Sequence, residues 1–195
     1  MEKKLDNMPA EELGRLFPII LSDYNAEWPV LYSKEESHIV HILKDIIHKI
    51  QHIGSTSVQG MTAKPTIDIL LEVKETADTE KLKEKLIKAG YRYLKKPENP
   101  PPYMMFLKGY TDNGFEGQAF HLHVMYPGDW DEPWFRDYLR NHKEVAEEYV
   151  QLKKELQKKY EHDRDRYTDC KTEFVKKYTE LARKEKNSGI NSKIY

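Results

Sequence analysis

The sequence predicts an α/β fold, more narrowly an α+β arrangement, with a mixed β-sheet of four or five strands flanked by helices and followed by a C-terminal helical extension. Three observations carry this prediction. Residues 66–73 alternate as a buried strand does, residues 28–47 repeat apolar side chains every three to four positions, and residues 131–186 follow a helical pattern throughout. We therefore expect a single domain over residues 1–186, with a sheet core at about 24–128, a helical part at about 130–186 and a disordered tail at 187–195.

The N-terminal half of the predicted core is a helix, a strand, a turn and a second strand. Residues 28–47 form an amphipathic helix that packs on the sheet, and the β-prone residues 49–53 lead into the small-residue turn 54–57. Residues 66–73 form a strand that is buried chiefly on one face. Asp68 alternates with Ile67 and Ile69, so its side chain lies on the opposite face of the strand. We therefore expect its carboxylate to point away from the aliphatic core.

The second half of the core begins with a packing helix at residues 79–89, capped by Thr79 and terminated by Gly90. A short strand at 91–94 precedes a surface loop at 95–102, where four prolines exclude helix and sheet. Strands at 103–108 and 118–126 are joined around Asp112-Asn113-Gly114, a hairpin signal. Three helices then fill residues 131–186, the first capped by Asp131.

Composition limits the function classes. Lys and Arg total 32 against 33 Asp and Glu, so no nucleic-acid partner is expected. The sequence contains neither a membrane-spanning apolar run nor an apolar signal core near its start, so we expect a cytoplasmic protein without membrane contact. A lone cysteine, Cys170, excludes an intrachain disulfide and is expected to be a small buried thiol. The oligomeric state is not signalled.

The candidate site rests on strand parity. In the strand 118–126, His121 and His123 share one face, opposite Phe120, Leu122 and Val124. If this strand neighbours residues 66–73 with both apolar faces inward, Asp68 and the two histidines lie on the same open side of the sheet. The turn at 54–57 would close that side. Backbone N–H groups, a carboxylate and imidazoles suit a phosphate-bearing ligand and a divalent ion.

Each signal has a structural alternative. A small-residue turn is often only a turn, Asp68 could form a buried salt bridge with Lys64 or an arginine, and a His-x-His pair could be held by hydrogen bonds alone. Lys64 and Arg136 could reach a phosphate, but most such cations are merely solvated. The aromatic and Met-rich residues 103–106 could offer a nucleobase a stacking surface, although core packing is the commoner role.

Several motifs resemble those of one known family. Residues 52–58 read His-Ile-Gly-Ser-Thr-Ser-Val, and residues 64–69 read Lys-Pro-Thr-Ile-Asp-Ile. Matching segments occur in order along about nine-tenths of the chain: residues 24–29, 121–124 and 135–140, then Asp163-Arg164, Tyr167-Thr168 and Lys171. By these motifs the sequence is similar to the GrpB (UPF0157-type) family, which belongs to the nucleotidyltransferase superfamily.

The resemblance implies a nucleotidyltransferase-like fold, in which active relatives hold a triphosphate on the Gly-Ser turn and magnesium on acids of the next strand. Active members usually carry two acids two residues apart. Here Thr66 stands at the first acid position if Asp68 is taken as the second, and Leu70 stands at the second if Asp68 is taken as the first; His121 or His123 replaces a third acid. Glu72 lies about 13 Å along the strand from Asp68, too far to share an ion.

The leading hypothesis is therefore an enzyme or enzyme-derived domain that binds a nucleotide or another phosphorylated small molecule. Nucleotidyl transfer is the reaction that this hypothesis favours. Asp68 and His123 are its candidate catalytic residues, and Asp68, His121 and His123 are the candidate ligands for Mg²⁺. The candidate phosphate- or nucleotide-binding residues are Gly54, Ser55, Thr56, Ser57, Lys64 and Arg136. The alternative is a non-catalytic accessory module with a degenerate metal site, since GrpB-like domains also occur fused to dephospho-CoA kinases.

Overall fold

The computed structural model describes residues 4–94 and 102–189. The chain forms two compact units. We call Asn25–Ser57 with Pro65–Asp129 the sheet unit, and Met1–Tyr24 with Val58–Lys64 and Trp130–Tyr195 the helical unit. Because residues 58–64 belong to the helical unit, the chain leaves the sheet unit after Ser57 and returns to it at Pro65. It therefore changes units at more points than the expected boundary near residue 130.

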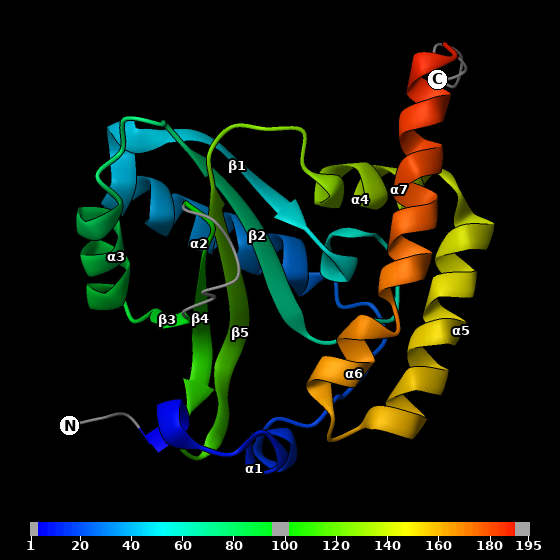
Figure 1. Ribbon diagram of the computed structural model, residues 1–195, viewed down its shortest axis with the longest axis horizontal. Helices are drawn as coiled ribbons and strands as arrows, with labels where there is room; N and C mark the ends of the chain where they lie inside the picture. Colours follow the sequence, from blue (N-terminus) through cyan, green and yellow to red (C-terminus); the bar gives the residue numbers. More distant parts are fainter. Residues whose placement is uncertain (1–3, 95–101, 190–195) are drawn as a thin grey trace. The chain divides into compact units, whose positions relative to one another are not determined.

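The sheet unit is built on five strands in the order β1-β2-β5-β4-β3 (Figure 1). Their bounds are Ile47–Ile53 for β1, Thr66–Val73 for β2, Arg92–Leu94 for β3, Met104–Thr111 for β4 and Gly114–Met125 for β5. β2 and β5 pair in parallel, and every other neighbouring pair is antiparallel. The expected mixed α/β sheet flanked by helices and followed by a helical extension is confirmed.

The central strand β2 is buried more completely than its alternation predicted. Its aliphatic residues Ile67, Ile69 and Leu71 are fully buried, but Thr66, Leu70 and Glu72 of the opposite parity are buried too. Asp68 is the one residue of β2 that keeps partial exposure. The neighbouring strands cover only the edges of β2, so burial of both side-chain parities shows that both of its faces are covered as well, a position in which near-continuous apolar runs are typical.

Helix α2 (Glu27–Leu43) is shorter than predicted. Lys44 adopts a left-handed φ of 46°, which ends the helix, and the 3-10 turn η2 (Lys44–Ile46) leads directly into β1. Helix α3 (Thr79–Lys88) is present as expected, but its N-cap is Asp78, whose side chain accepts from the Lys81 N–H, rather than Thr79.

The predicted hairpin is confirmed and is longer than the two sequence segments indicated. β4 and β5 pair from Met104↔Val124 to Thr111↔Gly114, around Asp112-Asn113-Gly114. The register shifts between Lys108 and Tyr110, and Gly109 lies in the shift with a φ of 83°. Most of the predicted proline loop, residues 95–101, lies outside the described residues.

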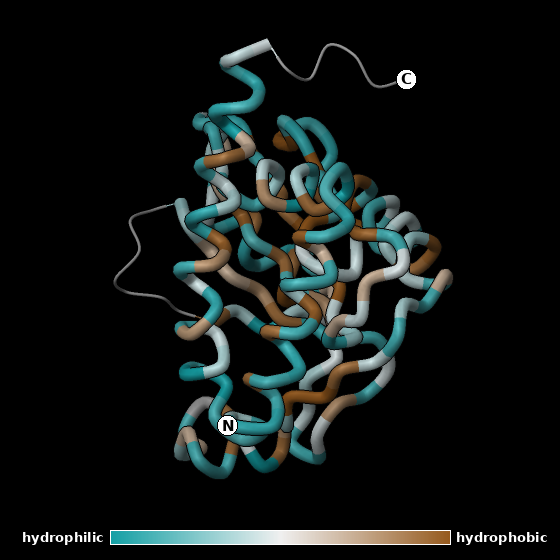
Figure 2. The backbone as a smooth tube through the Cα atoms, turned by 90° about the vertical axis from the view of Figure 1, so that its right-hand side faces the viewer, coloured by the Kyte–Doolittle hydropathy of each residue, from teal (hydrophilic) through white to brown (hydrophobic). Residues whose placement is uncertain are grey.

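The helical unit contains η1 (Lys4–Asn7), α1 (Ala10–Leu16), α4 (Asp131–Asn141), α5 (Lys143–Tyr160), α6 (Arg164–Asp169) and α7 (Thr172–Asn187). The expectation of three helices after residue 131 is wrong, because breaks at His142, at residues 161–163 and at residues 170–171 divide the segment into four. Hydrophilic and hydrophobic residues alternate along the C-terminal helix (Figure 2). A buried core of the helical unit comprises Val58, Met61, Phe135, Tyr138, Leu139, Val145, Tyr149, Tyr178 and Ala182.

Local expectations for the helical unit are partly corrected. Trp130, not Asp131, is the N-cap of α4; Asp131 is the first helical residue and its carboxylate pairs with Arg183 of α7. Cys170 is exposed rather than buried, because it follows the last turn of the short helix α6. Asn187, the first residue of the expected disordered tail, closes α7, and residues 190–195 lie outside the described part of the chain.

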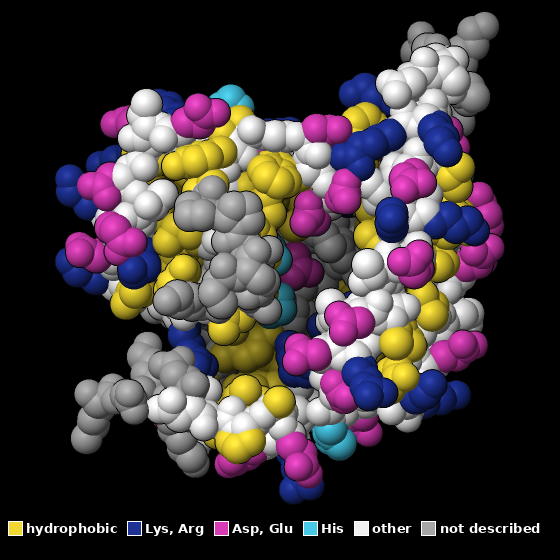
Figure 3. All heavy atoms as spheres, viewed as in Figure 1, with side chains coloured by type: hydrophobic (Ala, Val, Ile, Leu, Met, Phe, Trp, Pro, Cys, Tyr) yellow, Lys and Arg dark blue, Asp and Glu magenta, His cyan; other side chains and the backbone are white. Residues whose placement is uncertain are grey.

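The surface of the helical unit carries charges of both signs, interspersed over α5 and α7 (Figure 3). Within residues 4–94 and 102–189, no helix is long and apolar enough to cross a membrane.

Candidate metal and phosphate site

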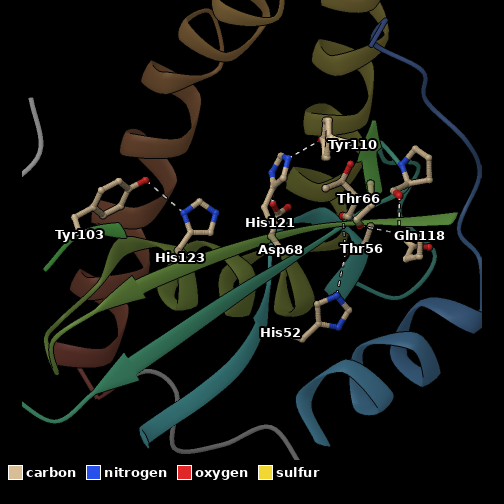
Figure 4. A network of polar contacts seen from close by, with 11 residues as sticks. His52, Thr56, Thr66, Asp68, Tyr103, Tyr110, Gln118, His121 and His123 are labelled. Carbon is tan, nitrogen blue, oxygen red and sulfur yellow. Dashed lines mark hydrogen bonds and ion pairs between the residues drawn. The ribbon is translucent and has the colours of Figure 1, made fainter. Parts of the chain in front are cut away.

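Asp68 and His121 are brought together by the parallel pairing of β2 and β5. The register places Asp68 directly opposite His121, and the two side chains point toward one another (Figure 4). Asp68 Oδ1 lies 3.1 Å from His121 Nδ1, while His121 Nε2 lies 2.7 Å from the Tyr110 hydroxyl. Both ring nitrogens of His121 therefore have polar partners, which fixes the orientation of the ring.

His123 completes the cluster from the next position of the same parity on β5. Its Nδ1 lies 3.4 Å from the Tyr103 hydroxyl, and its ring centroid lies 6.5 Å from that of His121. One potential ligand atom from each of Asp68, His121 and His123 lies within 4.8 Å of the others. Strand parity predicted this grouping, and the structure brings the three side chains together.

Burial controls the protonation of His123. The pKa of His123 is lowered to about 4: loss of hydration is the largest cause and His121 acts in the same direction, whereas the Asp68 carboxylate acts in the opposite one. His123 is therefore neutral at pH 7. A neutral imidazole offers a lone pair to a metal ion or to a hydrogen-bond donor.

The Gly54 turn lies directly against Asp68. Gly54 has a φ of 68°, and a Cβ placed there would lie 2.3 Å from Asp68 Oδ2. Only glycine combines this left-handed conformation with so close an approach. The spacing between the turn and Asp68 in the sequence thus corresponds to real contact in the fold.

Hydroxyl groups hold the turn in place through η3 (Ser55–Ser57). The buried Thr56 donates to the Thr66 carbonyl at 3.2 Å and lies 3.0 Å from His52 Nε2. The Ser57 hydroxyl and amide both donate to the Gly54 carbonyl, at 2.6 and 3.2 Å. The Ser57 N–H is therefore committed inside the turn, so phosphate binding by the turn would rely on the other amides of residues 54–57.

Lys64 and Arg136, the two predicted cationic contacts, belong to the helical unit. The Lys64 ammonium lies 5.3 Å from the centroid of the Tyr167 ring. Arg136 forms a two-pronged contact with Asp137, with Nε and Nη2 at 2.7 and 2.9 Å from the two carboxylate oxygens. The salt bridge between Asp68 and Lys64 that the sequence left open stays a prediction; within the sheet unit, Asp68 forms an ion pair with His121.

The donor set fits magnesium poorly. Mg²⁺ prefers six oxygen ligands, whereas this cluster offers one carboxylate and two imidazoles, which suit ions such as Mn²⁺ or Zn²⁺. Thr66 and Leu70, at the positions where a second acid would stand, are buried, and Glu72 accepts from the Gly128 N–H at 3.1 Å. The acids of β2 therefore supply one oxygen-bearing side chain, Asp68, to the cluster.

Two tyrosines are part of this cluster, and sequence reasoning gave neither of them this role. Tyr103 has the parity of Met105, which pairs with His123, so its diagonal contact with His123 could have been inferred from the hairpin register. Tyr110 reaches His121 from beyond the register shift at Gly109. The isolated Gly109 inside the strand could have indicated a β-bulge there, but not which side chain the bulge brings to His121.

Fold and site together define an α/β protein with a carboxylate–histidine cluster on neighbouring parallel strands, beside a glycine turn. The family model described as GrpB protein matches residues 18–181. The glutamate-rich protein GrpB of Alkalihalophilus pseudofirmus is 38% identical over 161 residues, covering 80% of this chain and 91% of that protein. The chain belongs to the GrpB family.

Further comparisons agree with this assignment. A UPF0157 protein of Pseudomonas aeruginosa is 39% identical over 150 residues, which are 76% of this chain and 61% of that protein. The crystal structure of the conserved protein GrpB from Enterococcus faecalis matches with a TM-score of 0.74 and 29% identity, covering 85% of this chain and 98% of that one. The fold is therefore that of an experimentally determined GrpB structure.

Proposed function

We propose that the sheet unit binds a nucleotide or another phosphorylated small molecule over the face that carries Asp68, His121 and His123. The observation that carries this proposal is the contact of the Gly54 turn with Asp68. Backbone N–H groups of a small-residue turn attract phosphate oxygens, and a carboxylate beside them can hold a divalent cation against the same phosphate. In active members of the superfamily to which the GrpB resemblance points, a Gly-Ser turn holds the triphosphate and acids of the next strand hold magnesium.

The role of each residue in the proposed site follows from its chemistry. The turn at residues 54–57 would orient phosphate oxygens, and Asp68 would hold the cation. His121 is positioned by Asp68 and Tyr110, and the neutral His123 would contact either the cation or a phosphate oxygen. Lys64 and Arg136 are two further proposed phosphate contacts, each argued from its charge alone.

Nucleotidyl transfer is the finer form of this proposal. It would proceed by positioning and charge stabilisation of an in-line displacement, with Asp68 and His123 as the reacting-centre residues. Two-metal chemistry requires several oxygen ligands around ions about 4 Å apart. The single carboxylate of the cluster supports binding more strongly than transfer.

The second candidate function is a non-catalytic binding or accessory module. It is favoured by the buried Thr66 and Leu70, which stand two residues on either side of Asp68 where the other acid of a pair would lie, because neither side chain can replace a carboxylate ligand. Divalent-metal-dependent turnover of a nucleoside triphosphate by the purified chain would reject this alternative.

Calorimetric titration of the full chain tests the proposal. The ligands are ATP, CTP, GTP, UTP and dephospho-CoA, each alone and with Mg²⁺ or Mn²⁺. We expect metal-dependent binding of at least one ligand, weakened about tenfold in Asp68→Asn, since a hydrogen bond or ligand contact of a charged group is lost. Asp112→Asn, which removes an exposed carboxylate of the same unit, is the matched control and should bind as the wild type does. A folded protein that binds none of the ligands would refute the proposal.

A further inference from the structure

Asp68 and His121 stand at the spacing of two ligands of one metal ion. A metal bound at about 2.1 Å to a nitrogen and an oxygen holds those two atoms about 3.0–3.4 Å apart, for octahedral or tetrahedral angles. Asp68 Oδ1 and His121 Nδ1 lie 3.1 Å apart, on strands whose register places the two residues opposite each other. A direct hydrogen bond has the same length, so the argument for an ion depends on a third ligand.

His123 supplies the third ligand from the same face of β5. One ligand atom from each of Asp68, His121 and His123 lies within 4.8 Å of the others, and the described residues contain no second group of three such side chains. A separation of up to 4.8 Å is wider than the coordination spacing, so a bound ion would draw the side chains together. The Asp68 side chain is 28% exposed, so an ion can reach it from solvent.

A tyrosine hydroxyl contacts one ring nitrogen of each histidine. His121 Nε2 lies 2.7 Å from the Tyr110 hydroxyl, and His123 Nδ1 lies 3.4 Å from the Tyr103 hydroxyl. The two tyrosines lie on the outer sides of the histidines (Figure 4), which leaves His121 Nδ1 and His123 Nε2 for an ion. Metal-bound histidines usually use their second ring nitrogen in such a contact, which fixes the ring and its tautomer.

We propose that Asp68, His121 and His123 bind a transition-metal ion of the Zn²⁺ type, in place of the Mg²⁺ that the superfamily resemblance implies. Imidazole nitrogen is a favourable ligand for Zn²⁺, whereas Mg²⁺ prefers oxygen ligands. Two imidazoles and one carboxylate leave a coordination position open, as zinc sites with a catalytic role do. The proposal rests on the proposed function in using the same site, and it names the cation; the open position takes water or a phosphate oxygen.

Calorimetric titration of the full chain with Zn²⁺ and with Mg²⁺, both without nucleotide, tests the proposal. We expect one Zn²⁺ ion to bind per chain and Mg²⁺ to show no binding at the same concentrations. His121→Gln and His123→Gln should each weaken Zn²⁺ binding by more than about a hundredfold, because loss of a group that merely orients a metal ligand already costs about 10–100-fold. His48→Gln, which removes an exposed histidine of β1, is the matched control and should retain wild-type affinity.

Co²⁺ gives a spectroscopic readout that requires no variant. Its visible absorption is intense in four- or five-coordinate sites with nitrogen ligands and weak when six oxygens surround it. We expect an intense visible band when Co²⁺ is added to the wild type, and loss of this band when Zn²⁺ displaces it. Absence of Zn²⁺ binding by the folded wild type would overturn the proposal. Wild-type affinity in both His121→Gln and His123→Gln, or an equal loss in His48→Gln, would also overturn it.

The outcome for the metal is distinguishable from the outcome for the proposed function. Zn²⁺ binding by a chain that binds neither nucleotides nor dephospho-CoA would support the metal site and refute the function. Mg²⁺-dependent nucleotide binding by a chain that does not bind Zn²⁺, with wild-type affinity in both histidine variants, would refute the metal site and support the function.

Discussion

Gly54 connects backbone conformation to the chemistry of the candidate site. Its left-handed φ and its contact with the Asp68 carboxylate are two separate constraints, and both exclude a side chain. Gly117 on β5 has nearly the same conformation, with a φ of 67°, but no atom lies within 4 Å of the position where its Cβ would be. A comparison of the two glycines therefore separates the free-energy cost of a side chain in the left-handed conformation from the cost of its clash with Asp68.

Gly54→Ala should therefore destabilise the fold more than Gly117→Ala. The conformational cost is about 1–2 kcal/mol for either residue, and only Gly54→Ala also has to displace Asp68. Urea unfolding of both variants measures the difference. Equal free-energy losses would contradict the contact with Asp68.

The lowered pKa of His123 predicts a specific dependence of stability on pH. Because the folded-state pKa, about 4, lies below the ordinary 6.5, the unfolded state binds more protons between these values. Stability should thus fall as the pH decreases from about 6.5 to about 4, with no contribution from His123 above this window. Urea unfolding at pH 7 and at pH 4.5 should show a smaller loss for His123→Gln than for the wild type.

The exposed His38 supplies the control for that measurement. His38→Gln should lose as much stability as the wild type between the two pH values. If His123→Gln behaves in the same way, the shift assigned to His123 is wrong.

At the scale of elements, a buried ionic contact ties α2 to the sheet. Lys108 of β4 donates to both carboxylate oxygens of Glu35, at 2.7 and 3.0 Å, and the Tyr91 hydroxyl donates to Glu35 at 2.8 Å. Glu35 lies on α2 among Trp28, Ile39 and Leu43, the apolar residues that the helix buries. Removal of the cation would leave a buried carboxylate without its counterion.

Lys108→Met should cost about 3 kcal/mol of unfolding free energy for this reason. Adding Glu35→Gln should recover part of the loss, because the neutral amide still accepts from Tyr91. A double-mutant cycle by urea unfolding measures the coupling. Lys83→Met, which breaks the surface pair with Glu80 on α3, should have a much smaller effect, and a comparable loss there would contradict the importance of burial.

Element type was more predictable from the sequence than element boundaries. Alternation and helical periodicity located all five strands and the two helices of the sheet unit, and parity placed Asp68, His121 and His123 on one face. The ends of α2, α4 and α6 at Lys44, His142 and Cys170 carry neither glycine nor proline, so no local signal marks them. Helix α1 was not predicted, and the contact of Tyr110 with His121 depends on a register shift whose effect only the assembled hairpin defines.

At the scale of the whole molecule, the two units are interleaved along the chain. Val58 and Met61 belong to the core of the helical unit although they lie between β1 and β2 in sequence, and Ile19 packs with Leu156 and Tyr167. The helical extension alone therefore lacks part of its own core.

A fragment of residues 130–195 should accordingly fail to form a stable cooperative fold, whereas the full chain should unfold cooperatively. Circular dichroism and binding of a hydrophobic dye measure the difference, with residual helix and exposed apolar surface expected for the fragment. A sharp thermal transition in the isolated fragment would show that Val58, Met61 and Ile19 are dispensable.

The parallel pairing of β2 with β5 also determines when the candidate site can form during synthesis and folding. Asp68 and His121 are 53 positions apart, so the candidate site depends on closing a long loop, which is entropically slow compared with forming the β4–β5 hairpin. On the ribosome, β2 emerges well before β5 and has no parallel partner until the hairpin has been synthesised. The nascent chain therefore acquires any ability to bind a ligand at this site only after β5 has docked, and the central aliphatic strand is exposed to aggregation until then.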